Sequence, residues 1–209
     1  MVAAELNNTS LVDWGIAGQP LPGQLVSGDV HVTRLFSRGA LLALIDGVGH
    51  GDEATAAARV AADLLETHAS ESVISLVKRC HQALAKTRGA VMTLASLNAM
   101  DDTVTWIGVG NVEGRLMRAG AGSGQPAESV LLRNGLVGLQ LPALQAAVLP
   151  LAPGDLLVFA SDGIRTGFER GLSQDEPPRN LAAQILSRHF KGTDDALVLV
   201  ARYLGWPRE

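Results

Sequence analysis

The fold of this chain is decided by residues 41–51, which read LLALIDGVGHG. Five successive apolar residues are typical of a strand that is buried on both faces. An unpaired carboxylate is unstable in a core, so Asp46 is expected at a sheet edge, facing water, a cation or a hydrogen-bond network. Gly47, Gly49 and Gly51 allow tight bends and close approach to a ligand. Because Asp-Gly is also a common turn dipeptide, the stretch alone does not separate a functional site from a turn.

The same pattern recurs, because further aspartates stand where other apolar runs begin or end. These aspartates are Asp29, Asp162, Asp194 and Asp195. Carboxylates brought together repel one another unless a cation or a proton intervenes. Oxygen ligands suit magnesium or manganese, and the sequence has no cluster of His and Cys at zinc spacing. The pattern predicts a site for a hard divalent cation, with aspartates in ordinary turns as the alternative.

Composition narrows the classes of protein and partner. The 209 residues suit a single domain, 1–209, and 47% are hydrophobic but only 4% aromatic, so Leu, Val, Ile and Ala must build the core. The net charge of -4 argues against a nucleic-acid partner. No apolar run reaches the roughly 18 residues that span a bilayer, so no membrane partner is expected.

Two features favour a cytoplasmic protein. The lone Cys80 is interpreted as a buried structural thiol, and the N-terminus lacks a signal peptide pattern.

The order of the predicted elements indicates the fold class. Strands are expected at 11–17, 25–36, 41–46, 90–97, 103–110, 111–117, 130–132, 146–151, 156–161 and 196–204. Helices are expected at 52–67, at 71–87 with Ser70 as its N-cap, and at 181–190. Residues 1–10 are interpreted as an edge segment and 120–125 as a loop. Because two helices follow one another instead of alternating with strands, the order favours an α+β sandwich of sheets with outer helices over a doubly wound sheet.

Three motifs together resemble a known family. They are Asp46-Gly47-Val48-Gly49-His50-Gly51, Ser161-Asp162-Gly163 and Asp194-Asp195-Ala196-Leu197-Val198. In this order and spacing they resemble the PPM, or type 2C, metal-dependent protein phosphatases, in particular their SpoIIE-type bacterial branch. Gly28-Asp29 and Gly108-Val109-Gly110-Asn111 also stand where that family has motifs, so the match runs from about residue 25 to residue 200. The resemblance implies an α-β-β-α sandwich with two central antiparallel sheets flanked by helices.

The resemblance also implies a site with two Mn²⁺ or Mg²⁺ ions. Asp46 would bridge both ions as the catalytic residue, and the carbonyl of Gly47 would bind the first. Asp162 and Asp194 would bind the second, and Asp29 would support the site directly or through water. Of the adjacent pair, Asp194 is the expected ligand and Asp195 a supporting residue. A water held between two metals attacks phosphoserine or phosphothreonine in line.

The sequence also departs from the family. Many members carry a histidine, a proposed general acid, where this chain has Val48, and His50 is interpreted as a structural histidine. No arginine matches the phosphate-binding arginine of some relatives. The segment from Gly163 to Lys191 connects two ligand aspartates, so part of it is expected to border the site, unless it is only a connector.

Three functions remain open at this stage. The first is a phosphatase, expected as a monomer, whose partners are phosphorylated proteins, namely the STAS-domain proteins of the bacterial stressosome. The second is a catalytically silent PPM-fold module that binds phosphoproteins, but such modules usually lose metal-binding aspartates and this chain keeps all four. The third is a receiver-type domain, which would require alternating strands and helices.

Overall fold

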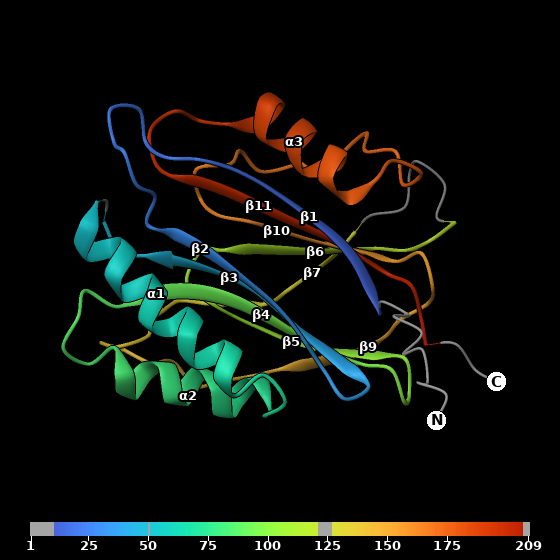
Figure 1. Cartoon of the computed structure of the whole chain (residues 1–209), viewed down its shortest axis with the longest axis horizontal. Helices are drawn as coiled ribbons and strands as arrows, with labels where there is room; N and C mark the ends of the chain where they lie inside the picture. The colour runs from blue at the N-terminus through green and yellow to red at the C-terminus, as the bar shows by residue number, and fades with distance from the viewer. Residues whose placement is uncertain (1–10, 50, 121–126, 207–209) are drawn as a thin grey trace, which may run out of the picture.

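The computed structural model describes residues 11–49, 51–120 and 127–206 of the chain. Two β-sheets lie face to face, and helices cover the outer face of each sheet (Figure 1). This arrangement confirms the α+β sandwich expected from the order of the elements. The predicted edge segment 1–10, His50 and most of the predicted loop 120–125 lie outside the described residues.

The first sheet has the strand order β1-β11-β10-β6-β7, and all of its neighbouring strands are antiparallel. Its strands are β1 (Val12–Gln19), β6 (Glu113–Met117), β7 (Glu128–Ser129), β10 (Leu156–Ala160) and β11 (Ala196–Tyr203). The strand β11 lies inside the sheet, where it pairs with β1 on one side and β10 on the other. Consequently the segments that precede β11 and follow β10 lie next to each other at one end of this sheet.

The second sheet has the order β2-β3-β4-β5-β8, with β9 also paired to β5. Its strands are β2 (Asp29–Phe36), β3 (Gly39–Gly47), β4 (Ala90–Asn98), β5 (Thr103–Val109), β8 (Leu132–Arg133) and β9 (Ala147–Pro150). Every pair is antiparallel except β5 and β8, which run parallel over two residues. The expectation of two antiparallel sheets is therefore confirmed apart from this short edge pair.

Three helices complete the described fold. The helices α1 (Asp52–Thr67) and α2 (Val73–Ala83) pack on the outer face of the second sheet, and α3 (Pro178–His189) packs on the first. None of the described helices is both long enough and apolar enough to cross a membrane. The lone thiol, Cys80, is buried in α2, and burial raises its pKa to about 12, as a structural cysteine requires.

The strand β3 has the double burial that its sequence predicts. Leu41, Ala43 and Ile45 pack against the helices, whereas Leu42 and Leu44 pack against the first sheet. Since side chains alternate along a strand, Asp46 shares the face of Leu42 and Leu44. The carboxylate therefore points toward the space between the two sheets, at the end where β3 stops.

Some predicted boundaries are wrong. The second helix begins and ends inside the predicted 71–87, and Ser72 rather than Ser70 caps it, accepting a hydrogen bond from the N–H of Ser75 at 3.2 Å. Residues 68–70 form a turn after α1, so the chain has not yet entered the second helix at Ser70. The strand predicted at 25–36 begins only at Asp29, because the preceding residues form a loop. The strand predicted at 130–132 is replaced by the short strands β7 and β8.

Candidate metal centre

Two of the predicted carboxylates face each other across neighbouring strands. Asp29, the first residue of β2, is the register partner of Asp46 near the end of β3. Paired residues on antiparallel strands lie on the same face of a sheet, so both carboxylates point toward the first sheet. The first sheet contributes Asp162, just after β10, and Asp194, just before β11. The structure thus brings together the four aspartates that were expected to form the metal site.

Ser161 connects the two sheets at this end of the sandwich. Its hydroxyl donates a hydrogen bond to Asp29 Oδ2 at 2.7 Å and accepts one from the N–H of Leu197 at 2.9 Å. Both Ser161 and Asp29 are buried. The hydroxyl therefore holds the Asp29 carboxylate at a fixed place relative to β11. In the sequence, Ser161 is recognisable only as part of a motif, and no local pattern indicates this role.

The two adjacent aspartates before β11 have different environments. Asp195 is buried, and its two carboxylate oxygens accept hydrogen bonds from the N–H groups of Leu21 and Gly28, both at 2.7 Å. Asp194 is half-buried, and one of its oxygens accepts a bond from the N–H of Asp195 at 2.8 Å. Asp195 thus fastens the loop before β2 to the start of β11, which fits a supporting role and leaves Asp194 as the better candidate ligand.

Two polar side chains flank Asp162. The amide of Asn111 donates to Asp162 Oδ2 at 2.8 Å, and the ammonium of Lys191 donates to the main-chain carbonyl of Asp162 at 2.5 Å. Asn111 belongs to a motif already noted in the sequence. Lys191 stands at the end of the segment that was expected to border the site, but nothing in its sequence context indicated that its side chain would reach Asp162.

Two glycines allow the backbone to pack tightly around the carboxylates. A Cβ atom on Gly47 would lie 2.1 Å from the carbonyl oxygen of Ala54 in α1, and one on Gly163 would lie 2.0 Å from the carbonyl oxygen of Asp195. Both distances are far below van der Waals contact. Glycine is therefore required at both positions for reasons of space, in addition to the backbone freedom that the sequence suggested.

The carboxylates are electrostatically unfavourable in the absence of a cation. Burial raises the pKa of Asp46 to about 9, and the neighbouring charge of Asp29 adds to this rise. Burial also raises the pKa of Asp29 to about 7, although the hydrogen bond from Ser161 opposes the rise. The pKa of Asp162 is raised as well, first by burial and then by the charge of Asp194. A bound cation would remove this repulsion by favouring the ionised carboxylates.

All of the candidate ligands are oxygen donors, a chemistry that suits magnesium or manganese. In residues 11–49, 51–120 and 127–206, no three acidic, His or Cys side chains are grouped as ligands of one ion. Mg²⁺ is commonly held by one or two carboxylates and keeps several waters. The groups that would hold such ions are the carboxylates of Asp29, Asp46, Asp162 and Asp194 and the carbonyl of Gly47.

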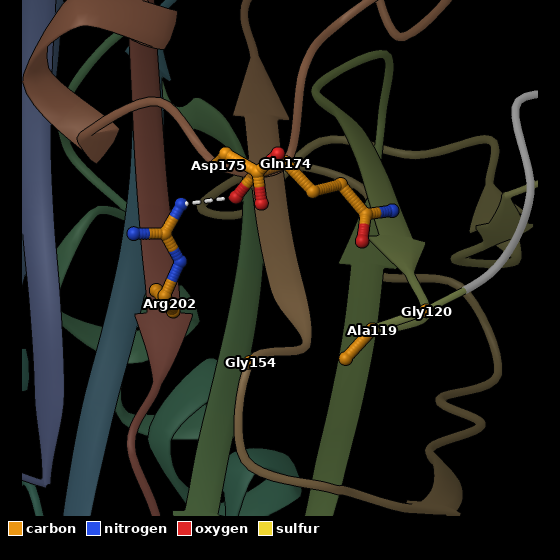
Figure 2. A pocket seen from close by; sticks show the side chains of 6 residues that line it. All are labelled: Ala119, Gly120, Gly154, Gln174, Asp175 and Arg202. Carbon is orange, nitrogen blue, oxygen red and sulfur yellow. Dashed lines mark hydrogen bonds between the residues drawn. The ribbon is translucent and has the colours of Figure 1, made fainter.

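A cavity of about 360 Å³ lies elsewhere, lined by residues that include Gly154, Gln174 and Arg202. Figure 2 shows Arg202 donating to the main-chain carbonyl of Gln174, at 2.7 Å. In the first sheet, Arg202 pairs with the first residue of β10, whereas Asp162 follows the last residue of β10 and Asp194 precedes the start of β11. The cavity is thus at the opposite end of the sheet from the carboxylates and plays no part in their chemistry.

The sandwich has the fold of the PPM, or type 2C, protein phosphatases, and the sequence match to their SpoIIE branch makes this chain a metal-dependent protein phosphatase. Residues 37–204 match the family model described as Stage II sporulation protein E (SpoIIE), and the chain belongs to that family. The match contains three of the four aspartates, and only Asp29 precedes it.

Several known proteins are similar to this chain. The phosphoserine phosphatase RsbX of Bacillus subtilis (strain 168) is 27% identical over 171 residues, which cover 79% of this chain and 84% of RsbX. The crystal structure of RsbX in complex with magnesium superposes with a TM-score of 0.80 at 21% identity, covering 91% of this chain and 94% of that one. Another solved chain comes from work on the bacterial stressosome, a modular system that has been adapted to control secondary messenger signaling. It superposes with a TM-score of 0.83 at 26% identity, covering 92% of this chain and 100% of that one.

Proposed function

We propose that this chain, as a single catalytic domain, hydrolyses phosphoserine or phosphothreonine on bacterial signalling proteins with the help of two Mn²⁺ or Mg²⁺ ions. One observation carries the proposal. The chain has the PPM sandwich, and at one end of it Asp29 and Asp46 of one sheet meet Asp162 and Asp194 of the other. A silent binding module would not need to keep four mutually repelling carboxylates at that place.

Each residue has a proposed role. Asp46 would help to hold both ions, the carbonyl of Gly47 would hold the first, and Asp162 and Asp194 would hold the second. Asp29, held by Ser161, supports the site directly or through water. When bound, the ions supply a water of lowered pKa as nucleophile and stabilise the negative charge of the phosphoryl group. Asn111 orients the Asp162 carboxylate through its hydrogen bond.

The proposed substrates are phosphorylated STAS-domain proteins of a stressosome. The similarity to RsbX and to a chain solved in stressosome work supports this choice. The segment from Gly163 to Lys191 joins two of the proposed ligands and carries the exposed side chains of Arg165 and Arg170. This segment offers a surface beside the site on which a folded partner would make remote contacts that position its phosphate.

The direct test is dephosphorylation of a purified, phosphorylated STAS-domain protein in the presence of Mn²⁺, with EDTA as the metal-free control. Turnover that requires Mn²⁺ supports the proposal, and no turnover with Mn²⁺ or, in a parallel assay, with Mg²⁺ contradicts it. A phosphopeptide with the same local sequence tests the choice of substrate. We expect kcat/KM to be much higher for the folded phosphoprotein, and equal values would contradict recognition of a folded partner.

A further inference from the structure

Lys191 places a positive charge beside the carboxylate cluster. Its side chain is exposed, yet its ammonium lies 2.5 Å from the main-chain carbonyl oxygen of Asp162. It is near enough to the Asp162 carboxylate for its charge to oppose the rise in the pKa of that group. The lysine therefore stands at the rim of the proposed metal centre and remains open to solvent and to a ligand.

The backbone holds this lysine in place. The N–H of Lys191 donates to the carbonyl of Gly163 at 2.9 Å, and the N–H of Arg165 donates to the carbonyl of His189 at 2.8 Å. Ile164 and Phe190 form an antiparallel bridge between these two bonds. The end of α3 is thus joined to the residues that follow Asp162, and the Cα atom of Lys191 keeps a fixed distance from the site.

The ammonium also has binding capacity left. A lysine ammonium carries three N–H donors, and one of them is used by the carbonyl of Asp162. Within the part of the chain that the structure describes, Lys191 forms no ion pair with a carboxylate. Arg88, which lies near Gly49, differs because it forms an ion pair with Glu53 at 2.5 Å.

We propose that Lys191 binds the phosphoryl group of the substrate, which deepens the proposed function and rests on it. Two free donors and an uncompensated positive charge match the oxygens of a phosphate monoester dianion. Lys191 would provide this contact from the junction between α3 and the segment after β10.

The test compares the affinity of three variants for inorganic phosphate, measured by titration calorimetry at saturating Mn²⁺. In Lys191→Met the affinity should fall about tenfold, because a hydrogen bond to a charged group contributes on that scale. Lys191→Arg keeps the charge and should retain most of the affinity. Lys78→Met is the matched control, since Lys78 is an exposed lysine of α2 that perturbs none of the cluster carboxylates, and it should bind phosphate like the wild type.

A second readout separates binding from folding. The rise in melting temperature on adding Mn²⁺ should be the same in Lys191→Met as in the wild type, and its loss would overturn the proposal by showing that the lysine maintains the metal centre. Phosphate affinity within twofold of wild type in Lys191→Met would also overturn it, while wild-type turnover would still uphold the phosphatase. A wild type without any Mn²⁺-dependent turnover would instead overturn the proposed function itself.

Discussion

At the scale of single residues, the aspartates of this site differ in which groups occupy their oxygens. Asp195 gives both oxygens to main-chain N–H groups, and Asp29 accepts the hydroxyl of Ser161. Asp46 has no such stabilising contact among the causes of its shift, which are burial and the charges of its neighbours. Asp195, whose two oxygens are occupied by main-chain N–H groups, therefore suits a supporting role. Asp46, whose pKa is raised by burial and by neighbouring charges, is the carboxylate that a cation would stabilise most.

Replacing Asp194 and Asp195 by asparagine, one at a time, tests which of them is a ligand and which a supporting residue. Asp195→Asn turns one acceptor into an NH₂ group facing a main-chain N–H, so we expect a loss of about 2–3 kcal/mol in unfolding free energy. Asp194→Asn should cost less stability but more turnover, because Asp194 is the proposed ligand. The measurements are urea unfolding and kcat/KM in Mn²⁺, taken where both variants are folded. The reverse order of activities would exchange the roles of the two residues.

Asp46→Asn tests the proposed bridging ligand. Mutating a residue that only orients a metal ligand typically lowers activity or metal affinity about 10–100-fold. Loss of Asp46, a proposed ligand of both ions, should therefore lower turnover at least about a hundredfold. Asn has the shape of a protonated aspartate, and the pKa of Asp46 lies near 9. The melting temperature of the metal-free variant at pH 8 should therefore equal or exceed that of the wild type. Turnover near the wild-type level would contradict the two-ion assignment.

At the scale of elements, the sequence predicts the features that depend on residues close together in the chain. The apolar run of β3 and the stripe of α1 follow from periodicity, and the helix observed at 52–67 has the predicted boundaries. The contacts of Asp195 with Leu21 and Gly28 join segments more than 160 residues apart. Lys191 reaches Asp162 only because of the bridge after α3. No local pattern encodes such contacts, so the partners of Asp195 and the contacts of Ser161 and Lys191 became visible only in the structure.

The tight junction between β10 and β11 can be tested at Gly163. A Cβ atom there would lie 2.0 Å from the carbonyl oxygen of Asp195, so Gly163→Ala must push the two segments apart. Overpacking of this kind costs about 1–3 kcal/mol, occasionally more, and here it should also weaken stabilisation by Mn²⁺, because Asp162 and Asp194 flank the junction. Thermal unfolding with and without Mn²⁺ measures both effects.

Gly171→Ala is the matched control for this substitution. Gly171 has a φ of 73° and nothing within 4 Å of an added Cβ, so alanine there costs only the strain of a left-handed backbone, about 1–2 kcal/mol. Its stabilisation by Mn²⁺ should remain that of the wild type. Equal losses of metal stabilisation in the two variants would show that the close approach at Gly163 does not position the ligands.

At the scale of the whole molecule, the site lies where the two sheets meet, so the protonation of its carboxylates is coupled to folding. The folded protein holds a proton on Asp46 up to about pH 9 and on Asp29 up to about pH 7. In the unfolded chain both groups ionise near pH 4. Because the native state binds more protons over this range, the stability of the metal-free protein must fall as the pH rises.

The comparison of the wild type with Asp46→Asn isolates Asp46 between pH 7 and pH 9. The other groups whose pKa values differ from the unfolded values near this range, Asp29, His31 and Cys80, are present in both proteins. In EDTA, the unfolding free energy of the wild type should fall between pH 7 and 9, by at most about 1.4 kcal/mol per pH unit for one proton. Asp46→Asn cannot release this proton, so its curve should be flatter by that amount. Saturating Mn²⁺ should remove or reverse the wild-type slope, since metal binds the ionised carboxylates. If the two proteins in EDTA gave parallel curves of unfolding free energy against pH, ionisation of Asp46 would not be what opposes folding. A cation would then not be needed to hold Asp46 where the two sheets meet.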